Sequence, residues 1–324
     1  MKKLFKTLFL ILLAVIIGTS AIFYKRIFLL YGIASKYISL EKEIDNLDTE
    51  FNIDPIENID YKDIVYKNTN GVPLTLDIYS PLKNVYEKSP VILYVHGGSW
   101  AYGDKSLPVA LTPVLDTFRE QGYTIISTSY ELMREKEDFS KQVEDVKDTI
   151  RWINKNAEQY NLDTYEIGLF GVSSGAHLAM MAAYTDENAF TNSEELKTYP
   201  CKVKYLIDFA GPTDLSLIDT SDLNFDLSKI FTSITDTDET IQKFNPINYV
   251  TSDIPKTLII HSKSDALVPF EGSEKLVEKC AQVHAKSKLI ALNSSSHDLS
   301  DISNDDIINI SKGLLFFVIA NSPI

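Results

Sequence analysis

The chain has 324 residues, of which 44% are hydrophobic and 23% are charged, so it has enough apolar material for a globular core. Its formal net charge of −14 argues against a nucleic-acid partner, because phosphate binding needs clustered Lys and Arg. The cysteines, Cys201 and Cys280, are too few for a disulfide framework and lack neighbours at metal-ligand spacing; a single disulfide between them stays open.

The N-terminal segment is first basic and then apolar. Three lysines within the first six residues precede an uncharged apolar run from Leu8 to Tyr24. About 20 apolar residues cross a bilayer, so we expect residues 1–26 to form a membrane anchor. A cleaved signal peptide with its site at "TSA", residues 19–21, followed by secretion, is the alternative. The lysines favour an extracytoplasmic catalytic domain, and residues 27–56 have the apolar spacing of a helical neck.

Strand and helix patterns alternate through the remaining residues, 57–324, which we expect to form one catalytic domain. Strand patterns occupy, in chain order, residues 63–68, 73–81, 90–98, 123–130, 166–173, 203–211, 256–265 and 287–297. The first two flank an Asn-Gly turn, which is typical of a hairpin. Helix patterns occupy residues 139–160, with Ser140 as a candidate cap, 174–184 and 271–284.

This order of elements predicts an α/β fold with a mostly parallel central sheet and helices on both faces. Ligands of such sheets bind at the carboxyl ends of the strands, so polar residues just past strand ends are the candidates for function. The pattern lapses between about residues 212 and 249 into an acidic, Thr-rich stretch. We interpret that stretch as a small insertion near the active face, where it would act as a lid.

A nucleophile candidate lies where the strand at 166–173 meets the helix at 174–184. Gly171-Val172-Ser173-Ser174-Gly175 has the form G-x-S-x-G. A serine on so sharp a turn needs small neighbours, and its hydroxyl lies at a helix N-terminus, where N–H groups favour negative charge. The strand–turn–helix context therefore predicts that Ser173 is a nucleophile rather than part of an ordinary glycine-rich helix start.

The base follows from the chain order that this kind of turn implies, which is serine, then acid, then histidine. His96 and His177 come too early or too close to Ser173, and His261 precedes the acid candidate. His284 comes before the last strand, at the wrong end of the sheet. His297, in the loop directly after that strand, is therefore the predicted base.

The acid should follow the strand before the last one. Asp265 lies in that loop, where it would accept the imidazole N–H of the base, fix its tautomer and stabilise the imidazolium. Asp214 is a rival after the preceding strand. Asp298 adjoins the base, but neighbouring side chains in a loop seldom meet in that geometry. We expect Asp265.

An oxyanion hole is predicted in the stretch "YVHGGSWAYGDK". Glycines let backbone N–H groups approach a substrate oxygen closely, so the N–H of Gly98, with that of Gly97, would supply one half. The N–H of Ser174, directly after the nucleophile, would supply the other.

With these elements in place, the chain from about Tyr61 onward resembles the α/β-hydrolases of the esterase/lipase superfamily. It is most similar to the hormone-sensitive-lipase-like and BD-FAE-type carboxylesterases. The matching stretches, in family order, are "GVPLTLDIYSP", "VILYVHGGSWAYGDK", "FSKQVEDVKDTIRWI", "GLFGVSSGAHLA", "TLIIHSKSDALVPFEGSEKL" and "SSSHD". The resemblance implies a Ser173, Asp265, His297 triad and an oxyanion hole at Gly97, Gly98 and Ser174.

The resemblance implies a serine hydrolase that cleaves small-molecule carboxylic esters without a metal or organic cofactor. Ser99 and Ala176 stand where relatives often have glycine; with the acidic insertion they lead us to expect short acyl groups. A peptidase or amidase on the same fold is one alternative. A catalytically inactive hydrolase fold that serves as a binding module is another.

Overall fold

The computed structural model describes residues 59–321 with interruptions. The undescribed positions within that range are 70, 135–137, 192, 219–236, 294–295, 298 and 300. The expected membrane anchor (1–26) and helical neck (27–56) lie outside the described residues. Within the described part, no helix is both long and apolar enough to cross a bilayer.

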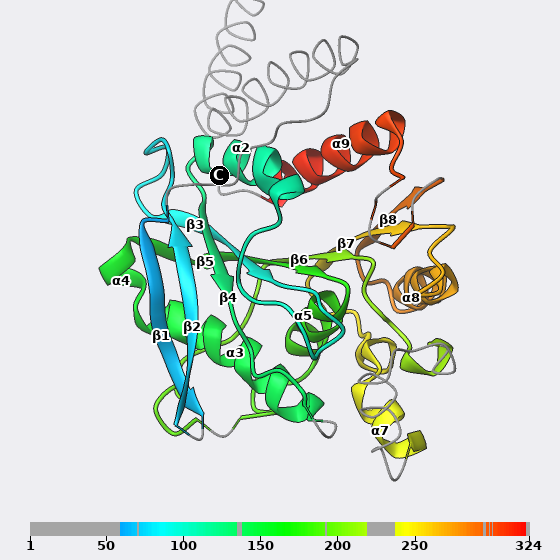
Figure 1. Ribbon diagram of the computed structural model, residues 1–324, viewed down its shortest axis with the longest axis horizontal. Helices are drawn as coiled ribbons and strands as arrows, with labels where there is room; N and C mark the ends of the chain where they lie inside the picture. Colours follow the sequence, from blue (N-terminus) through cyan, green and yellow to red (C-terminus); the bar gives the residue numbers. More distant parts are fainter. Residues whose placement is uncertain are drawn as a thin grey trace, which may run out of the picture.

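A single sheet forms the centre of the described residues, with eight strands in the spatial order β1-β2-β4-β3-β5-β6-β7-β8 (Figure 1). The strands are β1 (Tyr61–Thr69), β2 (Val72–Tyr79), β3 (Ser89–Val95), β4 (Thr124–Thr128), β5 (Leu162–Val172), β6 (Tyr205–Phe209), β7 (Lys256–Ser262) and β8 (Ser287–Leu292). The β1–β2 and β2–β4 pairs are antiparallel, and all pairs from β4–β3 to β7–β8 are parallel. The predicted mostly parallel sheet with an N-terminal hairpin is therefore confirmed.

Helices cover both faces of this sheet, as predicted. α3 (Phe139–Lys155), α5 (Ser174–Tyr184) and α8 (Phe270–Gln282) pack on one face, and α2 (Thr112–Glu120) and α9 (Asn304–Asn321) pack on the other (Figure 1). Successive residues of β3 alternate between the two cores: Leu93 joins the first and Tyr94 the second. All seven residues of β3 are buried because each side of this strand faces helices.

Shorter elements complete the described residues, and one local expectation needs correction. The shorter elements are α4 (Ala157–Tyr160), α7 (Thr237–Phe244), η1 (Val109–Leu111), η2 (Leu215–Leu217) and η3 (Pro246–Tyr249). The helices α2 and α9 were not among the predicted elements. The cap of α3 is Asp138, whose side chain accepts from the N–H of Lys141 at 3.4 Å, and not Ser140, which lies inside the helix. Cys201 and Cys280 are both buried and free, so they form no disulfide.

The parallel register brings the carboxyl ends of the central strands to one edge. Val95 at the end of β3 pairs with Gly171 of β5, and Val172 pairs with Phe209 at the end of β6. Ser262 at the end of β7 lies beside Leu292 of β8. The loops that carry the predicted site residues all leave the sheet at this edge.

Candidate active site

Ser173 occupies a strained turn between β5 and α5. Its φ of 53° and ψ of −123° lie in a region that residues with a side chain seldom adopt. Such a conformation costs about 1–3 kcal/mol and persists only where the surroundings impose it. Here the N–H of Ser173 donates to the carbonyl of Phe209 at 2.8 Å, and its own carbonyl accepts from Ala176 and His177. The turn is therefore anchored to β6 on one side and to α5 on the other.

Glycine is required on both sides of Ser173 because α5 lies directly against the strand ends. A Cβ on Gly171 would lie 2.4 Å from the Cα of Ala176. A Cβ on Gly175 would lie 2.3 Å from the carbonyl oxygens of Val95 and His96 at the end of β3. The blocking atoms are backbone atoms that cannot turn aside, so the G-x-S-x-G spacing follows from the packing of the helix on the sheet.

The structure brings Ser173, His297 and Asp265 into one chain of hydrogen bonds. Nε2 of His297 lies 2.9 Å from Oγ of Ser173, and Nδ1 of His297 lies 2.7 Å from Oδ2 of Asp265. An ionised carboxylate only accepts, so Nδ1 carries the imidazole proton and Nε2 is free to accept from the serine hydroxyl. The side chain of His297 is 20% exposed, which leaves it reachable from solvent.

Asp265 is fully enclosed, and each of its oxygens accepts two hydrogen bonds. Oδ1 accepts from the backbone N–H groups of Leu267 and Val268, both at 2.9 Å. Oδ2 accepts from His297 and, at 3.1 Å, from Nε2 of His261. Burial alone would raise the pKa of Asp265, but the hydrogen bonds from the two histidines and Val268 outweigh it and hold that pKa well below its usual value. The carboxylate therefore stays ionised.

Asp214, the rival acid that follows β6, has other partners. Oδ1 of Asp214 accepts from the backbone N–H of Ser216 at 3.0 Å and from Nδ2 of Asn245 at 2.8 Å, and this carboxylate caps the η2 turn. Asp298 lies outside the described residues.

The loop after β3 passes directly beside the nucleophile. A Cβ on Gly97 would lie 3.4 Å from the Cβ of Ser173. Gly98 has φ of 127°, and a Cβ there would lie 2.1 Å from the carbonyl oxygen of Tyr102, so only glycine fits. Ser174 begins α5, where the first N–H groups of a helix have no partner inside the helix. The glycines and Ser174 thus lie on either side of Ser173.

Two consecutive left-handed residues follow these glycines, and buried side chains hold them. Ser99 and Trp100 have φ of 51° and 62°. Nε2 of Gln142 on α3 donates to the carbonyl of Trp100 at 2.8 Å. The indole N–H of Trp100 donates to Nδ1 of His177 at 3.2 Å, and Nε2 of His177 donates to the carbonyl of Phe244 at 2.8 Å. Burial lowers the pKa of His177 to about 4, so the ring is neutral and can accept from the indole.

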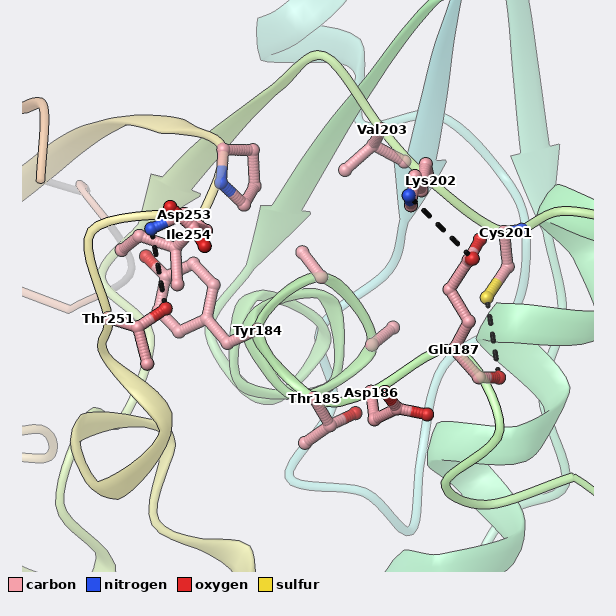
Figure 2. Close-up of a pocket in the computed structure, with 13 residues that line it drawn as sticks. Tyr184, Thr185, Asp186, Glu187, Cys201, Lys202, Val203, Thr251, Asp253 and Ile254 are labelled. Atoms are coloured by element: carbon pink, nitrogen blue, oxygen red, sulfur yellow. Dashed lines mark hydrogen bonds and ion pairs between the residues drawn. The ribbon is translucent and has the colours of Figure 1, made fainter.

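A cleft of about 450 Å³ lies at the opposite edge of the sheet, where α5 ends and β6 and β7 begin (Figure 2). The described residues that line it include no histidine. Cys201 faces it, but burial raises the pKa of that thiol, which therefore stays protonated. Lys202 pairs with Glu187 across its rim at 3.9 Å. This cleft lacks an activated nucleophile, and the catalytic candidates all lie at the other edge.

Comparison with known proteins identifies the family. The BD-FAE family model matches residues 76–280, which include Ser173 and Asp265 and end before His297. The chain belongs to the BD-FAE family. The resemblance to BD-FAE-type carboxylesterases, drawn above from sequence motifs, is thereby confirmed.

Relatives of this BD-FAE family member are esterases. It is 25% identical over 214 residues to Esterase LipC of Mycobacterium tuberculosis (strain ATCC 25618 / H37Rv), an alignment that covers 64% of this chain and 52% of LipC. It is 26% identical over 250 residues to the isoprenylcysteine alpha-carbonyl methylesterase ICME of Arabidopsis thaliana, covering 74% of this chain and 57% of ICME. The chain thus spans about half the length of these curated relatives.

A solved structure with the same fold is the truncated form of a carbohydrate esterase from gut microbiota. It superposes with a TM-score of 0.67 at 23% sequence identity, and the match covers 82% of this chain and 99% of that one. At this identity the likeness establishes the α/β-hydrolase fold alone.

Two polar residues, His261 and Gln142, make hydrogen bonds at this site that the sequence patterns do not predict. His261 was set aside because it precedes the acid, yet it contacts Asp265. Gln142 was not considered, although it occupies a buried position of α3 among apolar residues such as Phe139 and Val143. A buried amide on an apolar helix face was the signal that could have found it, because such a group needs hydrogen-bond partners.

Proposed function

We propose that this chain hydrolyses carboxylic esters through an acyl-enzyme, with Ser173 as nucleophile. His297 takes the hydroxyl proton as Ser173 attacks the ester carbonyl, and returns it to the leaving alcohol. Water then attacks the acyl-enzyme with His297 again as base. Asp265 holds the Nδ1–H tautomer of His297 and stabilises the imidazolium that forms in each half-reaction.

The developing oxyanion would be bound by backbone N–H groups. Gly98, with Gly97, and Ser174 flank the nucleophile from two different elements. Each donor of this kind lowers the barrier by roughly 3 kcal/mol. The loop after the glycines is held at Trp100, whose carbonyl accepts from Gln142 and whose indole N–H donates to His177, so little reorganisation would accompany the reaction.

The observation that carries the proposal is the chain of hydrogen bonds from Ser173 through His297 to Asp265, on three loops at one edge of the sheet. The serine is on a strained turn, the histidine is partly exposed and the carboxylate is ionised and enclosed. The similarity to LipC and ICME, both named as esterases, supports the same chemistry.

A fluorophosphonate probe and p-nitrophenyl esters test this assignment. Ser173→Ala should abolish labelling and lower ester turnover by several orders of magnitude. The matched variant Ser174→Ala retains its backbone N–H and should still be labelled. Undiminished labelling of Ser173→Ala would remove Ser173 as the nucleophile and point to its neighbour.

We further propose that the preferred acyl groups are short, with about two to four carbons. Ser99 is partly exposed in the loop beside Ser173 and adds a side chain there. Ala176 also stands where relatives often have glycine, but it is fully buried close to Gly211, so it does not support a short acyl preference. The acidic composition of residues 212–249 also disfavours a lid that would meet a lipid surface.

A series of p-nitrophenyl esters measures acyl preference. Each methylene that fits a pocket contributes about 0.8 kcal/mol, or about fourfold in kcat/KM. We expect kcat/KM to stop rising by butyrate and to fall by octanoate. A maximum at octanoate or longer would contradict the short-acyl proposal while leaving the nucleophile assignment intact.

The cellular location remains a proposal from the sequence. We propose that residues 1–26 anchor an extracytoplasmic catalytic domain of residues 57–324 through the segment 27–56. The full chain should then sediment with membranes and resist extraction by salt, whereas a chain starting near Asp54 should be soluble and active. Native protein trimmed after Ala21 and free in the medium would favour a cleaved signal peptide instead.

A further inference from the structure

Asp265 is contacted by two histidines, and the second one, His261, has no part in the scheme above. His261 lies in β7 with a fully enclosed side chain. Its Nε2 lies 3.1 Å from Oδ2 of Asp265, the same oxygen that accepts from His297. The aromatic ring of Phe270 packs edge-on against it, with ring centroids 5.6 Å apart. A buried imidazole on the oxygen that would face the catalytic base calls for a functional explanation.

The partners of His261 determine where its proton lies. Nε2 faces two acceptors, Oδ2 of Asp265 and the carbonyl of Val268 at 3.0 Å, so Nε2 must carry a hydrogen. Nδ1 lies 2.7 Å from Oγ of Ser273 on α8, whose hydroxyl can donate to it. A neutral ring with its hydrogen on Nε2 thus satisfies every contact, and Ser273 fixes the orientation of the ring.

This donor constrains the carboxylate of Asp265 on the side of His297. The N–H groups of Leu267 and Val268 hold Oδ1, while His261 and His297 share Oδ2. Without His261 the carboxylate would keep only one partner on Oδ2 and could rotate about its last bond. A hydrogen bond from a second donor also withdraws negative charge from the oxygen that faces His297.

We propose that His261 is a positioning residue of the triad: its Nε2–H fixes Oδ2 of Asp265 toward His297 and limits the negative charge that His297 meets. Ser273 holds His261 in this role through Nδ1. The proposal rests on the proposed function of Ser173, His297 and Asp265. His261 itself touches neither the nucleophile nor the base in the described contacts, and it acts through Asp265.

Loss of the His261 donor should move the pH dependence of kcat/KM in one defined direction. Removing the N–H of His261 leaves more negative charge on Oδ2, which stabilises the imidazolium form of His297. The acid limb of kcat/KM, which reports protonation of the base, should therefore move to higher pH. A purely structural role for His261 would lower activity at every pH and leave the position of that limb unchanged.

The titration of a second carboxyl near His261 must be separated from the effect of His261. Asp208 on β6 is buried, burial raises its pKa to about 7, and His261 lies within electrostatic range of it. Its titration overlaps the pH range of interest. The pH profiles are therefore measured in the wild-type and Asp208→Asn backgrounds, and a shift attributable to His261 must appear in both.

The experiment compares His261→Leu, which removes the donor, with His261→Gln, whose side-chain amide can still donate to Asp265. Profiles of kcat/KM for p-nitrophenyl acetate and of the rate of fluorophosphonate labelling are measured between pH 5 and pH 9. His261→Leu should lose about 10–100-fold in kcat/KM at neutral pH and shift its acid limb upward by at least about 0.5 pH unit. His261→Gln should recover most of the rate and the wild-type profile.

Ser273→Ala keeps the inference testable if His261→Leu does not fold. It removes the partner that orients His261 without touching Asp265. The acid limb should shift in the same direction by a smaller amount. An unshifted limb in Ser273→Ala and in any folded His261→Leu, or equal losses in the Leu and Gln variants, would overturn the inference. The proposed function fails separately, if the wild-type chain is not labelled at Ser173.

Discussion

Replacing Asp265 by Asn is the sharpest test of the candidate triad, because the structure specifies which way the new amide must turn. Oδ1 accepts from the backbone N–H groups of Leu267 and Val268, and Oδ2 accepts from the imidazoles of His261 and His297. The amide oxygen keeps two backbone hydrogen bonds if it takes the place of Oδ1. The NH₂ group must then point at the two histidines.

An NH₂ group in that position favours the wrong tautomer of His297. Nδ1 of His297 would have to accept from the amide, so the ring proton moves to Nε2, which faces Ser173. A protonated Nε2 cannot take the proton of the serine hydroxyl. We therefore expect kcat/KM to fall on the order of 10⁴-fold, which corresponds to about 5 kcal/mol of lost transition-state stabilisation. The N–H of His261 also loses one of its two acceptors and keeps the carbonyl of Val268.

The assay is kcat/KM for p-nitrophenyl acetate at neutral pH, with thermal unfolding to show that the variant is folded. Asp214→Asn is the matched control, because that side chain accepts from Ser216 and Asn245 and an amide oxygen can replace it. The control should lose far less activity. A loss below about tenfold for Asp265→Asn, or a larger loss for Asp214→Asn, would refute the assignment of Asp265 as the acid.

Three further predictions concern groups around the site. Burial raises the pKa of Asp208 to about 7, so the folded state binds this proton more tightly than the unfolded state, and the resulting stability is lost as pH rises from about 4 to about 7. The Tm of Asp208→Asn minus that of wild type should therefore be larger at pH 8.5 than at pH 5.5, and the same difference at both pH values would contradict this. Gln142→Ala removes the donor to the carbonyl of Trp100 and should lower kcat about tenfold with little change in KM; an effect on KM alone would contradict the role in the oxyanion loop. Gly175→Ala places a Cβ 2.3 Å from the carbonyl of His96 and should lower Tm by several degrees and abolish labelling, whereas a wild-type Tm would show that α5 is not fixed against β3.

Features that depend on residues close together in the chain could be predicted from the sequence. Buried parallel strands are continuous apolar runs, and the hairpin, the G-x-S-x-G turn and the His-Gly-Gly loop depend on local backbone chemistry. The sheet and the residues Ser173, Asp265 and His297 followed from these patterns and from the rule that loops at the carboxyl ends of parallel strands converge. The helices α2 and α9 were not assigned from the sequence.

What only the tertiary structure decided is which buried polar groups meet. His261 is four residues before Asp265 and was rejected as a base by chain order alone, yet the two share a hydrogen bond. Gln142 and Trp100 lie 42 residues apart and meet because α3 packs beside the loop after β3. Periodicity shows which face of an element is buried and turn chemistry shows local backbone shape, but neither specifies which polar side chains meet. The partner of a buried imidazole or amide depends on how the helices and loops are placed around the sheet, which no local pattern specifies.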